Sequence, residues 1–296
     1  MRPDGPCIMT GMFQRKTSGS VVCPSCGSLV GVRDDKCYTC GRANPGLWGF
    51  GPALRQLGAD LGFVPMVVGV SSVLYVLTLL VSGEEIQIAG GGLNFLAPSG
   101  RVLQIFGMSG AIPVFVYAAW WTVLSASWLH GNLLHILFNM YWVRRLGPDA
   151  VALIGPARTV IVYVASGVTG FLLSSVSAYF LGRVPLVGGG FFTMGASASI
   201  LGLVGAIAHY GRKGGSSLIR AEVTQLIIWF AVMGALMPQT DNAAHIGGFL
   251  GGYAVSSLLN PFTRERGDHL IVAFACLAVT FLAVVFSILR GFALLG

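Results

Sequence analysis

The strongest constraint on this chain is a series of apolar runs, each about as long as a membrane is thick. They lie near 63–82, 128–146, 157–181, 219–237, 242–259 and 269–289. A run of roughly 17 to 25 apolar residues spans a hydrocarbon core as a helix. Hydrophobic residues make up 54% of the chain and charged residues 10%, which excludes an ordinary soluble domain. We therefore predict an all-α polytopic membrane protein.

A further apolar segment, 197–210, is too short to span the bilayer. At about 1.5 Å per residue it covers roughly 21 Å of a core about 30 Å thick. We expect it to begin or end inside the membrane. Irregular backbone at that depth survives only where protein or water surrounds it, so such segments often carry the chemistry of a membrane protein.

The basic residues predict the orientation. Of the 18 Lys and Arg residues, a topology with the N-terminus inside leaves only Arg101, Arg183 and Arg290 outside. The positive-inside rule then predicts a multi-pass protein with a cytosolic N-terminus and an outside C-terminus. The net charge of +7 needs no nucleic-acid partner, because it follows from this bias and from a basic tail near anionic headgroups of the lipid bilayer.

The composition changes along the chain suggest five regions. They are a disordered tail over 1–22, a cysteine-rich module over 23–44, an interfacial linker over 45–62, a membrane domain over 63–260 and a seventh transmembrane helix over 261–296. The outside loop that follows the first span is more than about 40 residues long. That is too long for a simple connection, and we expect part of it to enter the membrane as a half-inserted hairpin.

Two C-x2-C pairs form the cysteine-rich module. The pairs are Cys23/Cys26 and Cys37/Cys40. This spacing predicts a small ribbon in which four thiolates hold a structural zinc, with Gly27 and Gly41 at positions that favour a positive φ. A redox pair of the thioredoxin type and two disulfides are the alternatives. The first needs a larger βαβ context, and the second is disfavoured in a reducing cytosol.

Large polar side chains gather in the second predicted span. His130, His135 and Asn139 lie there, although such groups are costly in lipid. His135 and Asn139 are four residues apart and therefore share a helix face, while His130 lies toward the outer end. At 1.5 Å per residue their depth predicts that Ser197, which begins the short segment, lies level with that face.

The last part of the pattern is His245, one turn into the sixth predicted span. Gly248 and Gly252 follow it with small-xxx-small spacing, which lets two helix backbones approach closely. The short segment offers a matching face of Ala198, Gly202 and Ala206. Close packing of these two helices would bring the His245 imidazole within reach of the Ser197 hydroxyl, as a base beside a nucleophile.

Taken together, His-x4-His-x3-Asn, Gly-x-Ser and Ala-His-x2-Gly-x3-Gly resemble the rhomboid family of intramembrane serine proteases over roughly 120–255. The resemblance implies a bundle of six helices plus a C-terminal seventh, acting on single-span membrane protein substrates without a cofactor for catalysis. It implies Ser197 as nucleophile and His245 as general base. His135 and Asn139 would be oxyanion-hole donors beside the Ser197 backbone N–H, and His130 would support the outer opening.

The chain departs from the family pattern at three places: Ala198 follows the serine in place of glycine, Leu201 replaces a ring, and Trp121 is followed by Thr122. Asp241 is expected to cap the sixth helix, so a Ser-His dyad is preferred over a triad. The alternative is a catalytically inactive rhomboid-like protein that binds membrane clients. A transporter is a further alternative, but it would need charge pairs or ion ligands at mid-depth, and none of the predicted spans has an acidic residue in its interior.

Overall fold

The structure, a computed structural model, describes residues 16–23, 26–49, 61–87, 95–182, 184, 187–237, 239–263, 265 and 267–295. The chain divides into two compact units, Met1–Gly62 and Phe63–Gly296. Residues 1–15 of the expected tail and 50–60 of the expected interfacial linker lie outside the described residues. The division at Gly62 coincides with the predicted start of the membrane domain.

The first unit contains a two-stranded antiparallel sheet of β1 (Ser20–Val22) and β2 (Leu29–Gly31), followed by the short helix η1 (Leu47–Gly49). Strand β1 lies within 1–22, which the sequence assigns to a disordered tail. The structure places these three residues, at the end of that range, in a strand. The strand is ordered because each of its residues pairs with one residue of β2, a pairing that composition does not reveal.

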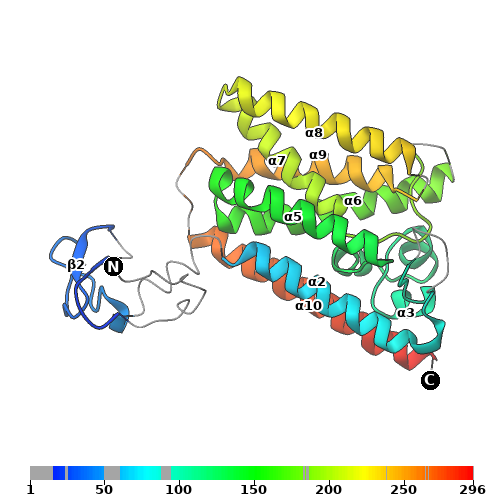
Figure 1. The fold of residues 1–296 in the computed structure, drawn as a ribbon, viewed down its shortest axis with the longest axis horizontal. Coiled ribbons are helices and arrows are strands. Elements are labelled where there is room, and N and C mark those ends of the chain that lie inside the picture. Colours follow the sequence, from blue (N-terminus) through cyan, green and yellow to red (C-terminus); the bar gives the residue numbers. More distant parts are fainter. Residues whose placement is uncertain are drawn as a thin grey trace, which may run out of the picture. The chain divides into compact units, whose positions relative to one another are not determined.

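The second unit is helical. Its elements are α2 (Phe63–Ser82), η2 (Gly83–Glu85), α3 (Gly100–Ile105), η3 (Ile112–Val116), α4 (Thr122–Ser125), η4 (Ala126–Trp128), α5 (Leu133–Ile154), α6 (Pro156–Leu181), α7 (Ser197–Lys213), α8 (Ser217–Leu236), α9 (Asn242–Leu259) and α10 (Gly267–Leu295). The long helices form the bundle in Figure 1, with the short ones gathered at one end. This confirms the predicted helical fold.

Helix α6 lies at the centre of the bundle, where it packs on α7, α9 and α10. Its apolar window is 67% buried, whereas that of α8 is 17% buried, so α8 lies at the periphery against α7. Four described helical stretches are long and apolar enough by themselves to cross a membrane: Phe63–Glu85, Pro156–Leu181, Ser217–Leu236 and Asp268–Ala293. The other long helices, α5, α7 and α9, carry the polar candidate residues.

Helix α5 begins later than the apolar run predicts. The expected span is 128–146, but the helix starts at Leu133, where Asn132 caps it by accepting a hydrogen bond from the His135 N–H at 2.7 Å. His130 therefore lies in the loop before the helix. At the other end α5 continues through Arg145, whose exposed side chain pairs with Asp149 one turn on and with Glu222 of α8.

The loop between α2 and α5, which the sequence predicts to lie outside and which we call the outer loop, folds into α3, η3, α4 and η4 in place of a hairpin. A short antiparallel bridge between Ser109 and Thr193 fixes this loop to the segment that precedes α7. The loop is therefore part of the frame around the start of α7.

Candidate functional site

Ser197 is the first residue of α7, directly after a turn at Gly195. Gly195 has φ +124°, a conformation that L side chains rarely adopt, and its N–H donates to the Ala126 carbonyl at 2.9 Å. Ser197 itself is half-buried. The turn thus places a hydroxyl at a helix N-terminus, where the free backbone N–H groups favour developing negative charge.

Two candidate residues of α5 converge on the same turn. A Cβ at Gly195 would lie 2.5 Å from His135 Nε2 and 3.8 Å from Asn139 Nδ2, so both side chains approach this backbone. The Asn139 amide donates to the His135 carbonyl at 2.9 Å, and His135 Nδ1 accepts from the Gly131 N–H at 3.3 Å. The acceptor role of Nδ1 leaves Nε2 as the protonated nitrogen, which is the atom that faces Gly195.

His130 lies beside His135, in the loop that precedes α5. It is 1% exposed, and its ring lies edge-to-face with that of His135, with centroids 5.1 Å apart. The loop that carries His130 joins η4 to α5, and His135 lies in the first turn of α5. His130, His135 and Asn139 therefore lie together, as expected from their spacing in the sequence.

Helices α7 and α9 touch backbone to backbone at glycines. A Cβ at Gly248 would lie 2.1 Å from the Ala198 carbonyl oxygen, and one at Gly252 would lie 2.0 Å from that of Gly202. The two glycines predicted from small-xxx-small spacing therefore make the contact, and Gly205 adds a third contact against the Phe249 carbonyl oxygen. This contact brings the first turns of the two helices together, with Ala198 and Ala244 in one buried cluster.

His245 lies in the first turn of α9 and is half-buried. Its ring makes an edge-to-face contact with Phe230 of α8, with centroids 6.5 Å apart. Within the described ranges, the Ser197 hydroxyl and the His245 ring are not joined by a hydrogen bond. Nucleophile and base are often further apart before substrate binds than in the reacting complex.

Asp241 is the N-cap of α9. One of its carboxylate oxygens accepts from the Ala244 N–H at 2.9 Å, and the other accepts from the Ser174 hydroxyl of α6. Ser174 also accepts from the Gly190 N–H at 2.9 Å. The carboxylate therefore holds α9, α6 and the loop before α7 together, which confirms the capping prediction.

The methyl group of Ala198 points into a niche made by a glycine on α6. A Cβ at Gly170 would lie 2.7 Å from the Ala198 Cβ, and Ala198 is 1% exposed. The sequence analysis did not single out Gly170. Its signal is the run of small residues in α6 that includes Ser166, Gly167, Gly170 and Ser174, which marks a face for close helix packing.

Ser199, the other hydroxyl of this segment, faces elsewhere. It is fully buried and lies 3.3 Å from the Ser127 hydroxyl of η4. This position separates it from the turn at Gly195 and makes it a matched control for Ser197.

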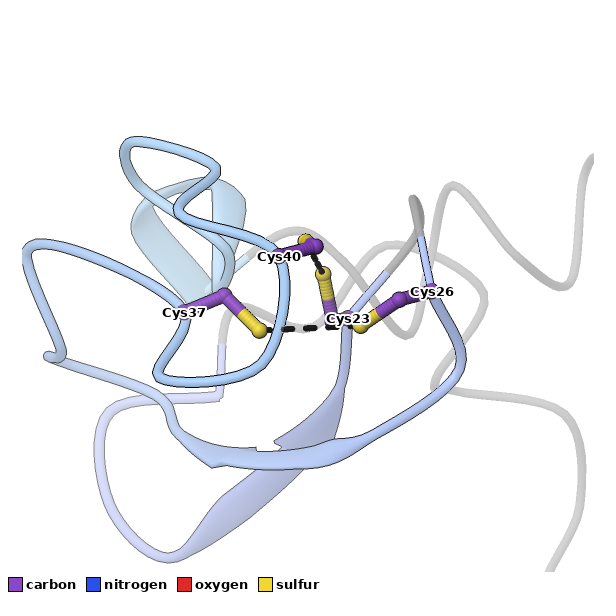
Figure 2. Close-up of side chains that lie close together, drawn as sticks. All are labelled: Cys23, Cys26, Cys37 and Cys40. Carbon is purple, nitrogen blue, oxygen red and sulfur yellow. Dashed lines mark hydrogen bonds between the residues drawn. The ribbon is translucent and has the colours of Figure 1, made fainter.

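The first unit brings its four cysteines together (Figure 2). Their sulfur atoms all lie within 4.8 Å of one another, with Cys23 and Cys40 3.8 Å apart and Cys26 and Cys37 3.6 Å apart. Metal–sulfur bonds of about 2.3 Å in a tetrahedron give sulfur separations of about 3.8 Å. The cluster is therefore able to hold a metal ion.

The two cysteine knuckles have the local structure that their glycines predict. Gly27 and Gly41 have φ of +82° and +71°, and their N–H groups donate to the carbonyls of Cys23 and Cys37. Hydrogen bonding with the side chain and backbone of Ser28 lowers the pKa of the exposed Cys26 thiol to about 6. Because the thiolate is the form that binds a metal, this lowered pKa favours metal binding by Cys26.

Comparison with known proteins agrees with the motif pattern. Residues 117–262 match the family model described as the Rhomboid domain. The chain is 28% identical over 169 residues to Rhomboid protease GluP of Bacillus subtilis (strain 168), a match that covers 55% of this chain and 31% of that protein. It is 31% identical over 173 residues to RHOMBOID-like protein 7 of Arabidopsis thaliana, covering 55% and 50%.

A third relative bears on activity. The chain is 28% identical over 135 residues to Inactive RHOMBOID-like protein 8 of Arabidopsis thaliana, covering 44% of this chain and 35% of that protein. The chain matches half or less of the length of each of these three relatives. The family model matches part of the helical unit and leaves the cysteine module outside the match.

Proposed function

The chain belongs to the rhomboid family, and on that premise we propose that it is an intramembrane serine endopeptidase that cleaves transmembrane segments of single-span membrane proteins. Ser197 and His245 form the catalytic dyad. The observation that carries the proposal is the glycine-mediated contact of α7 with α9, because it juxtaposes the two helix ends on which these residues lie.

In this mechanism the Ser197 Oγ attacks the scissile carbonyl carbon while His245 takes the hydroxyl proton. The resulting oxyanion is stabilised by the Ser197 backbone N–H and by His135 Nε2 and the Asn139 amide, which approach the Gly195 turn. His245 then protonates the leaving amine as the acyl-enzyme forms. A water molecule, deprotonated by His245, attacks the ester and restores free Ser197.

Asp241 has no direct role in this proposal. Its carboxylate is occupied by the α9 cap and by Ser174, so it stabilises the frame that holds His245. Phe230 of α8 makes an edge-to-face contact with the ring of His245.

The test uses the purified full chain reconstituted in lipid, a model transmembrane substrate and a serine-directed fluorophosphonate probe. We expect cleavage and labelling by the wild type, and loss of cleavage by at least about 10³-fold in Ser197→Ala and in His245→Ala. Ser199→Ala is the matched control and keeps both signals. Full cleavage by Ser197→Ala would refute the assignment.

The second candidate function is an inactive client-binding protein. Two observations favour it: the described Ser197 and His245 are not hydrogen-bonded, and one relative is named inactive. The probe separates the two functions without knowledge of the substrate. Absence of labelling in well-folded wild type, together with capture of a single-span client, supports this candidate in place of the protease.

For the cysteine module we propose a structural zinc held by all four thiolates. Four cysteines fill the tetrahedral coordination, so this metal activates no water and is not part of catalysis. We also propose that this module and the N-terminus face the cytosol, with the C-terminus outside, on the distribution of basic residues. Protease treatment of sealed cells that carry a tag at each terminus tests this orientation. The proposal predicts that the added protease removes the C-terminal tag and leaves the N-terminal tag intact.

A further inference from the structure

The outer loop is tied to the C-terminal part of α10 by four contacts. The Trp121 indole N–H donates to the Ser287 hydroxyl at 3.0 Å, and the Arg290 guanidinium lies 4.8 Å from the centroid of the same ring. Arg290 also donates to the Tyr117 carbonyl at 3.3 Å. In addition, Phe286 meets the Trp121 ring edge-on, with centroids 4.7 Å apart. Three side chains on one face of α10 therefore contact the same loop residue, Trp121.

The fit of α10 in this place depends on two glycines. A Cβ at Gly291 of α10 would lie 2.8 Å from the Cα of Ile105 in α3, and a Cβ at Gly107 would lie 2.7 Å from the Ser287 hydroxyl. Figure 1 shows this end of α10 beside α3. Helix α10 therefore packs closely against α3 and the loop that follows it. This packing fixes the position of the backbone that carries Arg290.

The loop in turn holds the segment that leads into Ser197. Ser109 and Thr193 exchange two backbone hydrogen bonds, at 3.0 and 2.7 Å, and the N–H groups of Ala111 and Ile112 donate to the carbonyls of Gly190 and Phe191. On the other side of the loop the Thr122 hydroxyl lies 3.2 Å from that of Ser109. A continuous set of contacts therefore runs from Arg290 through Trp121 and Thr122 to Thr193, just before the Gly195 turn.

We propose that Arg290 is a positioning residue for the active site: it clamps Trp121 and the Tyr117 carbonyl, and through the outer loop it fixes the 190–195 segment and hence the Ser197 turn. The residue after Trp121 is the uncharged Thr122, and the cation over the Trp121 ring comes from α10, a distant part of the chain. A guanidinium over an indole face makes an attractive cation–π contact even where, as here, the site is partly exposed. The proposal rests on the proposed protease function for its kinetic test only.

The central variant is Arg290→Met, which keeps the length and helix propensity of the side chain while removing the charge and the hydrogen bond. We expect kcat to fall about five- to tenfold with KM nearly unchanged, because Arg290 does not touch the substrate but alters the alignment of the nucleophile. The rate of fluorophosphonate labelling should fall by a similar factor. Arg290→Lys should restore part of the loss, since an ammonium keeps the cation–π contact. Phe281→Leu, on an exposed face of α10, is the matched control.

A second measurement is independent of catalysis. Hydrogen exchange should speed up in Arg290→Met at the backbone amides of 109–112 and 193, while amides in the middle of α6 stay protected. A purely structural role of Arg290 would lower protection and thermal stability throughout the bundle. Local loosening of the loop with an unchanged unfolding temperature supports the clamp.

A double-mutant cycle with Trp121→Leu completes the test. If Arg290 acts through Trp121, the two changes are non-additive, and Arg290→Met costs little in the Trp121→Leu background. Additive losses, or unchanged exchange and kcat in Arg290→Met, overturn the clamp while leaving the protease assignment intact. If the wild type neither cleaves nor labels, the proposed function fails, and the exchange data still decide the clamp.

Discussion

The cysteine module and the helical unit differ in what stabilises each of them internally. The cysteine module has one small cluster of buried residues in its described part, comprising Val21, Cys23, Val30, Val32 and Cys37. We therefore expect its stability to depend on the metal ion that we propose the four cysteines bind. In the helical unit the central contact of α7 with α9 depends on the absence of side chains at Gly248 and Gly252. Removing a ligand should therefore damage the first unit, and adding an atom should damage the second.

The largest expected effect is metal removal from the cysteine module. Structural zinc sites contribute about 10 to 16 kcal/mol of apparent binding free energy, far more than so small a core supplies. Metal analysis should give about one zinc per chain in the wild type and none in Cys23→Ser with Cys26→Ser. Cys276→Ser in α10 is the control and keeps the zinc. Labelling of Ser197 should stay largely intact in all three, and its loss in a still-folded helical unit would show that the two units are coupled.

Adding one methyl group at the α7–α9 contact tests whether the helical unit depends on its glycines. Gly248→Ala places a Cβ against the Ala198 carbonyl, and such overpacking costs about 1 to 3 kcal/mol or more. We expect a lower unfolding temperature in detergent and loss of most labelling, with zinc content unchanged. Gly69→Ala in α2, where a Cβ would meet no atom within 4 Å, is the matched control. Equal stability of the two variants would mean that the α7–α9 contact is not required.

Substitution of Asp241 distinguishes a Ser-His dyad from a catalytic triad. Asp241→Asn keeps an N-cap side chain and removes the charge, so we expect cleavage within about tenfold of the wild type. A triad carboxylate replaced in this way costs about 10⁴-fold in kcat, and a loss of that size would make Asp241 part of the catalytic machinery. Asp241→Ala should lower stability by about 1 kcal/mol, because both the cap and the Ser174 contact are lost.

How far the sequence predicts the structure depends on the range of the interaction. The helical class, the α9 bounds and the positive φ of Gly27 and Gly41 follow from local patterns. The start of α5 does not follow from the local pattern. The apolar run begins at 128, but the side chain of Asn132 caps the helix so that it begins at Leu133. The pairing of β1 with β2 and the contact of α10 with Trp121 join distant residues, for which a single sequence carries no periodic signal.

The site shows the same division. Motif spacing places His135 and Asn139 on one face, and the structure brings both to Gly195. The ring that packs on His245 comes from α8, at Phe230, and not from one turn after Ser197, where Leu201 stands. The niche for Ala198 comes from α6, at Gly170. A departure from a family motif in one helix is thus matched by a residue in another, and only the fold reveals the match.

The smallest expected effect concerns that niche, and it decides whether Ala198 silences the site. Because the methyl of Ala198 is already accommodated at Gly170, Ala198→Gly should cost about 0.5 to 1 kcal/mol through helix propensity and should leave labelling within about twofold of the wild type. Gly170→Ala, which brings two Cβ atoms to 2.7 Å, should lose stability and labelling. Ala198→Gly should rescue Gly170→Ala only in part, because it removes one methyl group of the pair but leaves the new Cβ 2.7 Å from the Ala244 carbonyl oxygen. A large gain of labelling in Ala198→Gly alone would instead mean that the alanine has weakened the enzyme, and would favour the client-binding function.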